Sequence, residues 1–474
     1  MPFLVGAIVL AVGAGLWLAR RGGRSPAGPP AGLGLLRRAV DVKPDEVRIL
    51  LLSCAYFFFI LTSYYIVRPI RDQMGVAGGV QNLPWLFSGT LAGMLVLNPL
   101  FSALVVRFPR KRFIPYTYRF FMLNLLVFFV LLRSLPEPQQ IWLGRAFYIW
   151  VSVFNLFVVS VFWAFMTDIF RNEQSKRLFG FIGVGGTLGA IFGASITAFF
   201  AKVLSPPNLL LVSMVFIEVA VQFVRVLGRH AGESPRPTPA AALPAGAAKE
   251  RVIGGNALAG LTHVARSPYL LGICVYMLVF TVGSTFLYFQ QAQIVSQAVT
   301  DRAAQTALFA RIDLMVNVLT VVIQVFLTGR LLKWFGVSVT LALIPAVSAI
   351  GFLGLGLMPT LAIVIAFQVA RRAGNFAVAR PTREVLFTVI PREDKYKAKS
   401  FIDTFVYRAG DQVGAWSYKL MGLFGLGVSG IAFVAVPISI MWFVMSLWLG
   451  RRQARMAGRQ PDEPFIPAGA GVVT

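Results

Sequence analysis

Twelve apolar runs, each long enough to cross a lipid bilayer, constrain this chain more than any other feature of its sequence. A membrane-spanning helix needs about 20 predominantly apolar residues. The composition agrees, since 57% of the residues are hydrophobic and 13% are charged, whereas soluble domains carry about 25% charged residues. The sequence therefore predicts an all-α polytopic membrane protein. Its predicted spans are 48–67, 84–106, 114–133, 146–167, 178–202, 207–227, 268–290, 306–329, 337–358, 361–382, 400–422 and 427–449.

Two stretches without apolar periodicity set the predicted domain organisation. Both are rich in Gly, Pro and Ala, and the second separates six spans from six; this composition is typical of flexible linkers. The apolar run before the first stretch has no basic residues in front of it, which disfavours a cleaved signal peptide. The predicted parts are an additional N-terminal membrane helix within 1–20, a cytoplasmic linker at 21–45, a six-helix bundle at 46–228, a cytoplasmic central linker at 229–266, a second six-helix bundle at 267–450 and a cytoplasmic tail at 451–474.

Basic residues alternate along the loops and predict the orientation of the body. Lys and Arg are abundant before the first span, after every even-numbered span and after the last, while the other loops carry few. Cytoplasmic loops have such an excess, so we expect both ends of the body in the cytoplasm and the protein in a bacterial inner membrane. The same rule accounts for the net charge of +25 without a nucleic-acid partner.

The sequence repeats itself weakly at an offset of 220 residues. Cys54 and Cys274 lie at this offset, in the first span of each predicted bundle. The turn after the fourth span also matches the turn after the tenth, in the pairs Asn172-Glu173 with Arg392-Glu393, Arg177 with Lys397, and Phe181-Ile182 with Phe401-Ile402. These matches indicate a duplicated six-helix unit. Two parallel six-helix repeats are typical of major-facilitator transporters, and this is the predicted fold class.

Charged residues inside two apolar helices, between Arg371 and Gly414, carry the main functional signal. A charge at mid-membrane costs at least about 2.5–3.5 kcal/mol, so such residues usually face a partner or a water-filled pathway. Arg372 and Arg383 are eleven residues apart, close to three helical turns, which predicts one shared face. Asp403 and Asp411 share a face of the next span in the same way. Cationic and anionic faces of this kind predict a substrate pathway.

Other polar residues at membrane depth extend the predicted site. Arg71 either holds substrate or snorkels from the interface, and Asp168 belongs to a charge cluster that either pins a turn or forms a gate. Asp313 either carries a coupling proton or pairs with an arginine; no role is predicted for Glu218. The predicted substrate-binding residues are Arg71, Arg119, Arg372 and Arg383; the predicted gate residues are Asp72, Asp168, Glu173, Glu384, Asp403 and Asp411.

Enzyme, metal and cofactor signatures are not found in the sequence. Both histidines lie in the central linker, and neither belongs to a metal-binding or nucleophile–base motif. Gly185, Gly189 and Gly193 do not have the spacing of a nucleotide-binding loop. Small residues at four-residue spacing are typical of close helix packing in membranes. We therefore predict a protein that is not an enzyme and has no cofactor or bound metal.

Several motifs resemble the ATP/ADP translocase family of nucleotide exchangers, over about residues 50–425. Arg71-Asp72 resembles a Lys-Asp pair of the family. A second run, Trp163 with Glu173-Gln174-Ser175-Lys176-Arg177, is similar to its W…E-A-K-R motif. The most specific match comprises Pro381-Thr382-Arg383-Glu384, Ile390-Pro391, Lys397-Ala398-Lys399 and Ile402-Asp403, which resembles P-x-K-E…I-P…K-x-K-A-x-I-D with its spacing kept.

The resemblance implies a major-facilitator-like fold and nucleotide exchange across the membrane. Two family lysines are replaced by Arg71 and Arg383, and an arginine presents a planar fork instead of a point charge. We therefore expect a monomeric secondary transporter in the lipid bilayer for an organic anion, with a nucleotide as the leading substrate. Two alternatives stay open at this point: a proton-coupled permease for a non-nucleotide solute, and a transport-inactive assembly partner or sensor.

Overall fold

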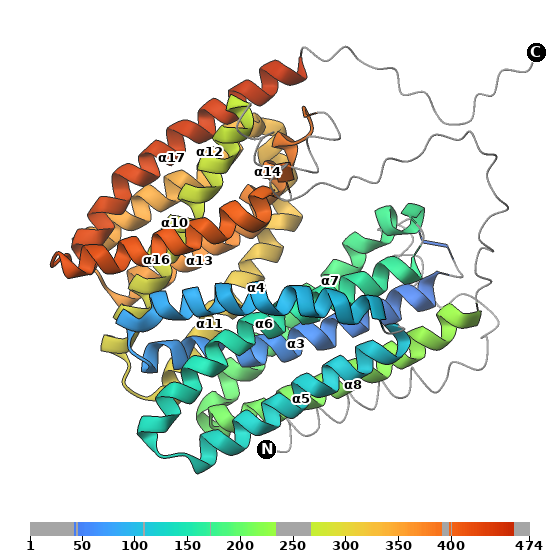
Figure 1. The fold of residues 1–474 in the computed structure, drawn as a ribbon. Coiled ribbons are helices and arrows are strands. Elements are labelled where there is room, and N and C mark those ends of the chain that lie inside the picture. The colour runs from blue at the N-terminus through green and yellow to red at the C-terminus, as the bar shows by residue number, and fades with distance from the viewer. Residues whose placement is uncertain are drawn as a thin grey trace, which may run out of the picture. The chain divides into compact units, whose positions relative to one another are not determined.

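The computed structural model describes residues 42–458, with gaps at 44–45, 108–109, 171, 234–266, 391–397 and 400. Every regular element in this part of the chain is helical (Figure 1), and the predicted all-α polytopic class is confirmed. The predicted N-terminal helix within 1–20, most of both linkers and the end of the tail lie outside the described residues.

The chain forms two compact units, which are described separately. The first comprises residues 1–248 with 295–318, and the second comprises 249–294 with 319–474. Helices α10 and α11 therefore contribute to both. The predicted six-plus-six division of the sequence stays a prediction. In chain order the helices are α3 (Val47–Ala77), η1 (Val80–Asn82), α4 (Leu83–Arg107), α5 (Arg110–Ser134), α6 (Glu137–Ile169), α7 (Asn172–Leu204), α8 (Pro206–Glu233), α10 (Pro268–Ala298), α11 (Arg302–Phe326), α12 (Thr328–Leu357), α13 (Leu361–Gly374), η2 (Asn375–Ala379), α14 (Arg380–Leu386), η3 (Ile402–Val406), α16 (Tyr407–Leu423) and α17 (Val428–Ala457).

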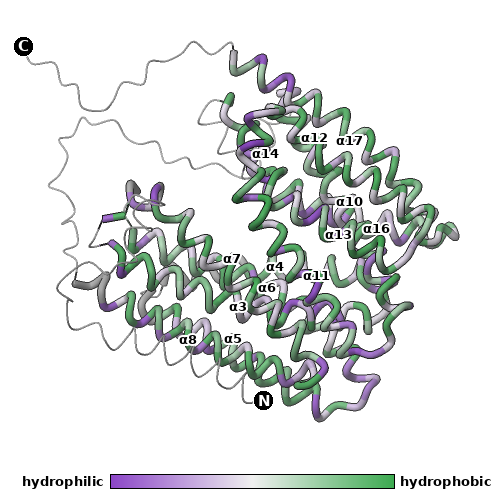
Figure 2. The backbone as a smooth tube through the Cα atoms, turned by 180° about the vertical axis from the view of Figure 1, so that it is seen from behind, coloured by the Kyte–Doolittle hydropathy of each residue, from purple (hydrophilic) through white to green (hydrophobic). Residues whose placement is uncertain are grey.

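Eleven helices among the described residues are long and apolar enough to cross a membrane. Figure 2 shows that hydrophobic residues dominate the helices of both units. The span expected at 400–422 takes a different form, because it consists of the π-helical η3 followed by the 17-residue α16. The tenth expected span is likewise interrupted, since the π-helical η2 separates α13 from α14. Both π-helical segments lie in the charged stretch singled out in the sequence.

Helix α3 forms the centre of the first unit, where it packs against α6, α7 and α8. Its closest approach is to α7, through the three glycines spaced at four residues. A Cβ atom on Gly189 would lie 2.2 Å from the Phe58 carbonyl oxygen, and one on Gly193 would lie 2.4 Å from that of Thr62. Only glycine permits this separation. The predicted packing role of these glycines is confirmed.

The second unit repeats this close approach between α16 and α10. A Cβ atom on Gly410 would lie 1.8 Å from Thr281 Oγ1, and one on Gly414 would lie 3.0 Å from Thr285 Cβ. Gly410 and Gly414 follow Gly189 and Gly193 by 221 residues, close to the offset found in the sequence. The helix pairs α3–α7 and α10–α16 are therefore built on the same plan.

Candidate functional site

Arg371 is the most deeply buried arginine of the second unit, with 3% of its surface exposed. It lies near the end of α13, a helix capped at its start by the Thr360 hydroxyl, which accepts a hydrogen bond from the backbone N–H of Ile363. The guanidinium donates from Nε to Ser348 Oγ at 3.0 Å and from Nη1 to Ser284 Oγ at 2.7 Å. It thereby connects α13 with α12 and α10.

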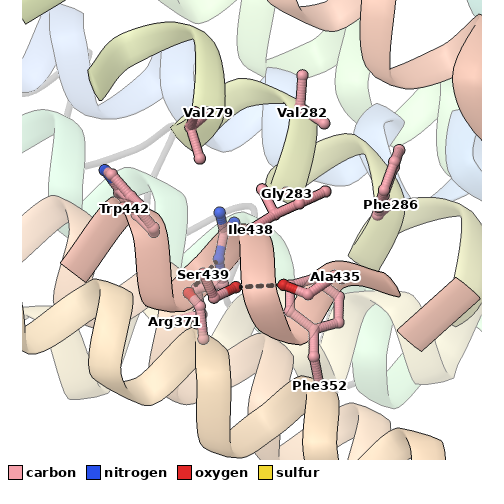
Figure 3. A pocket seen from close by; sticks show the side chains of 11 residues that line it. Val279, Val282, Gly283, Phe286, Phe352, Arg371, Ala435, Ile438, Ser439 and Trp442 are labelled. Atoms are coloured by element: carbon pink, nitrogen blue, oxygen red, sulfur yellow. Dashed lines mark hydrogen bonds between the residues drawn. The ribbon is translucent and has the colours of Figure 1, made fainter. Parts of the chain in front are cut away.

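A third hydrogen bond and two aromatic rings complete the surroundings of Arg371. Nη2 donates to the Phe280 carbonyl oxygen at 3.0 Å. The guanidinium carbon lies 5.2 Å from the Phe280 ring centroid and 5.8 Å from that of Trp442, within the range of cation–π attraction. Arg371, Ser348 and Trp442 line a small cavity (Figure 3) of about 10 Å³, room for about one water molecule. Gly283 and Phe352 also line it.

Arg383, on α14, is the second buried arginine of this unit, and 12% of its side chain is exposed. Its Nη1 contacts Met277 Sδ of α10 at 2.8 Å, and its Nη2 lies 3.6 Å from Asp403 Oδ1 of η3. The Nε donor is buried without a hydrogen-bond partner among the described residues. The ion pair with Asp403 is long, and the carboxylate side chain is 36% exposed.

The structure brings a further arginine, Arg371, to the face of Arg383; the shared face of Arg372 and Arg383 stays a prediction. The π-helical η2 lies between them, and a π turn takes up one more residue than an α turn. Arg371, twelve residues from Arg383, is therefore brought to the face that Arg383 occupies. Both side chains contact α10, and Arg372 is half-buried beside them.

In the first unit, Arg71 and Arg68 have carboxylate partners. Arg71 pairs with Asp72 at 2.6 Å, and its guanidinium lies 4.8 Å from the Tyr148 ring centroid. Arg68 lies 3.5 Å from Asp313 of α11, whose side chain is 2% exposed. Of the two roles predicted for Asp313, the structure shows the pairing with an arginine.

Arg119 also has a carboxylate partner, on a more open part of the same unit. It pairs with Glu218 of α8 at 2.9 Å, and 42% of the Arg119 side chain and 34% of the Glu218 side chain are exposed. Glu218, which the sequence left without a role, also accepts a hydrogen bond from Gln222. This pair links α5 to α8, and the structure does not bring Arg119 together with Arg371 or Arg383 in one unit.

The remaining predicted gate residues are distributed over both units. Glu384 pairs with Lys399, and Asp411 lies 3.4 Å from Arg408 Nη1 on its own helix. Asp168 is exposed at the end of α6. The side chain of Glu173 lies outside the described residues.

Glu46 is a buried carboxylate that the sequence did not single out. It precedes α3, is 5% exposed, and accepts hydrogen bonds from Arg177 at 3.0 Å and Gln174 at 2.9 Å. Burial alone would raise the pKa of Glu46, but hydrogen bonds from Gln174, the Lys43 backbone N–H and Arg177, together with the charge of Arg177, lower it below its usual value. This cluster ties the start of α3 to α7. Its sequence signal was the Gln174–Arg177 run, which carried no indication of a partner.

The family model that matches this chain is that of the Major Facilitator Superfamily, over residues 79–393. Among solved structures, a bacterial homologue of the iron transporter ferroportin is similar with a TM-score of 0.59 and 10% identity, covering 86% of this chain and 99% of that one. A POT family peptide transporter is similar with a TM-score of 0.56 and 16% identity, covering 86% and 97%. At these identities the likeness concerns the fold.

Weak sequence similarity extends over most of the chain to carriers from Chlamydia. ADP,ATP carrier protein 2 of Chlamydia pneumoniae is 22% identical, covering 86% of this chain and 90% of that protein. ADP,ATP carrier protein 1 of Chlamydia muridarum is 20% identical, covering 78% and 81%. The resemblance noted in the motifs is thus confirmed as a divergent, nearly full-length similarity. The proteins compared are transporters and carriers.

Proposed function

Since this chain belongs to the Major Facilitator Superfamily, and is accordingly a multi-pass membrane transporter for a small molecule, we propose that it carries an organic anion by alternating access. A nucleotide, exchanged as ATP against ADP, is the leading substrate. The proposal includes a location in a bacterial inner membrane, both ends of the body in the cytoplasm, and function as a monomer.

The observation that carries this proposal is the environment of Arg383. This arginine belongs to the Pro381-Thr382-Arg383-Glu384 motif and is nearly buried, yet Asp403, the carboxylate that pairs with it among the described residues, is 36% exposed. A guanidinium fork suits a phosphate or a carboxylate, which it can bind through two parallel hydrogen bonds. A substrate anion can therefore compete with the partly exposed Asp403 for Arg383.

The similarity to the Chlamydia carriers supports a nucleotide over other anions. It covers most of both chains, including the region of this motif, and those proteins are named for carrying ADP and ATP. The arginines at positions 71 and 383 depart from the lysines of the family motif. Because arginine binds phosphate through a planar fork, this departure preserves recognition of an anion while changing its geometry.

Ion pairs that form and break would supply the gates of such a carrier. In the proposed cycle, the anion replaces Asp403 as the partner of Arg383, which loosens the contact between α14 and η3. The Arg68–Asp313 pair ties α3 to α11 and is proposed to open when the carrier changes state. Pairing of Asp313 in this way favours a gate role over proton coupling.

The test is counter-exchange in liposomes that contain the purified full-length protein. Vesicles loaded with ADP should take up labelled ATP, and Arg383→Ala should reduce this uptake at least about a hundredfold, since loss of charge-assisted contacts at a buried site costs several kcal/mol. Arg452→Ala, which alters an exposed arginine of α17, is the matched control and should transport normally.

Three outcomes would contradict the proposal. Normal uptake by the Arg383→Ala variant would remove this residue from the site. Uptake of an uncharged solute driven by a pH gradient, without exchange of any anion, would favour the proton-coupled permease instead. A wild-type protein that transports no solute in these vesicles would favour an assembly or sensor role.

A further inference from the structure

The charge of Arg371 is not neutralised by the residues around it. Its three hydrogen-bond acceptors, Ser348, Ser284 and the Phe280 carbonyl, are all uncharged. Among the described residues no carboxylate forms an ion pair with Arg371. A buried cation is costly to keep without a negative partner. Since the helices at this depth are membrane-spanning, bulk water does not supply the compensation either.

Arg371 and Arg383 lie along the same side of α10, at two levels. Arg383 contacts Met277, whereas Arg371 contacts Phe280 and Ser284. At a rise of 1.5 Å per residue, these levels are about 5–10 Å apart along the helix axis. The Tyr407 side chain interacts electrostatically with both guanidinium groups. The two cations are therefore at different levels of α10 and close enough for one extended anion.

The charges and the unused hydrogen-bond donors of Arg371 and Arg383 also favour a ligand with more than one negative group. Among the described residues, Asp403 is the carboxylate that forms an ion pair with one of these two guanidinium groups. A guanidinium has five N–H donors; Arg371 uses three of them for its protein partners, and the Nε donor of Arg383 has no partner. Once Asp403 leaves Arg383, two positive charges and several donors are available to a ligand.

We propose that Arg371 is a second anion-binding residue, which receives a negative group of the substrate that Arg383 does not reach. The substrate class is then an anion with two linked negative groups, such as the phosphate chain of a nucleoside diphosphate or triphosphate, or a short dicarboxylate. This inference rests on the proposed function and adds a requirement on the substrate. The π-helical η2 between the two arginines sets their common face, and Gly283 leaves room beside the guanidinium, because a Cβ there would lie 3.3 Å from Arg371 Nη2.

A purely structural role for Arg371, as a link between α10, α12 and α13, makes a different prediction. In that case its replacement lowers the stability of the protein and affects all ligands equally. A binding role instead affects ligands with two negative groups more than ligands with one. The decisive readout is therefore the preference between two such ligands, measured on the same folded protein.

The experiment measures thermal stabilisation of the detergent-purified full-length protein by pyrophosphate, orthophosphate, succinate and acetate. A ligand that binds the folded state raises its melting temperature by an amount that grows with the logarithm of the ligand concentration divided by Kd. Wild type should bind pyrophosphate or succinate at least about tenfold more tightly than the matching single-group anion, as expected for one more charge-assisted contact. The preferred pair tells whether the two groups are phosphates or carboxylates.

Arg371→Gln should abolish this preference while leaving binding of the single-group anion unchanged. Arg371→Lys should retain part of it, and Arg452→Ala, which removes an exposed arginine of α17 outside the site, should retain it all. If Arg371→Gln does not fold, Gly283→Ala serves as the second variant. It keeps the charge but displaces the guanidinium, and should weaken binding of the two-group anion more than that of the single-group anion.

An unchanged preference in Arg371→Gln, or in Gly283→Ala where that variant replaces it, would overturn the inference and leave anion transport intact. Equal binding of single-group and two-group anions by wild type would overturn it as well. Wild-type protein that neither binds nor transports any anion would instead overturn the proposed function, and this inference with it.

Discussion

The two units treat their buried arginines differently. In the first, Arg71 lies 2.6 Å from Asp72 and Arg68 lies 3.5 Å from Asp313. In the second, Arg371 has only uncharged acceptors, and Arg383 has a carboxylate at 3.6 Å. The Arg68 and Arg383 ion pairs are similar in length, but the Asp313 side chain is 2% exposed and that of Asp403 is 36% exposed. A cation with a buried counter-charge fixes the helices that carry the pair. A cation whose counter-charge is exposed, or that has only uncharged acceptors, can accept a ligand. The two units share a helix-packing plan, but the arginines of the first fix helices through ion pairs and those of the second can bind a ligand.

The glycine contacts of the two units also differ, although both bring two helices close together. Gly189 of α7 faces the backbone of α3, since the nearest atom to an added Cβ is the Phe58 carbonyl oxygen. Gly410 of α16 instead faces a side chain, the Thr281 hydroxyl. A substitution can shorten a side chain but cannot remove a backbone atom. We therefore expect that a side chain at Gly189 cannot be accommodated by a second substitution. A side chain at Gly410 can be accommodated in part when Thr281 is replaced by a smaller residue.

The largest effect on stability is expected from Asp313→Asn. This change leaves the Arg68 guanidinium buried without its counter-charge, which costs about 3 kcal/mol or more. Arg371→Gln should cost less, because it leaves only uncharged groups without a partner. Melting temperatures of the two variants in detergent test this order. If Arg371→Gln is the less stable protein, the contrast between the units is wrong.

An intermediate effect is expected from the glycines. Gly189→Ala and Gly410→Ala should each destabilise the fold by about 1–3 kcal/mol through overpacking. Adding Thr281→Ala should recover part of the loss in Gly410→Ala, because it removes the nearest atom. Adding Phe58→Ala should recover nothing in Gly189→Ala, because the clash is with the backbone. Equal recovery in both double variants would contradict the distinction drawn here.

The smallest effect is expected at Glu46. Because the folded-state pKa of Glu46 is lowered, its ionised form adds stability above its unfolded-state pKa of about 4.3, and this stability is lost as pH falls through the folded-state value. Glu46→Gln should therefore cost about 1 kcal/mol at pH 7 and progressively less as the pH falls below the unfolded-state pKa. Melting curves of both proteins between pH 7 and pH 3 check the sign. A loss that grows on acidification would show that the pKa is raised instead.

The sequence by itself determined the helical membrane class, the approximate limits of most spans and the glycine contact between α3 and α7, because hydrophobicity and small side chains act locally. It also placed Arg383 and Asp403 in one region through a motif. Only the structure showed that Arg371 joins Arg383, because the π-helical η2 adds a residue to one turn and brings Arg371 toward α10. Tertiary structure likewise decided which cations are neutralised, because Asp313 and Glu218 are distant in sequence from Arg68 and Arg119 and meet them only when the helices pack.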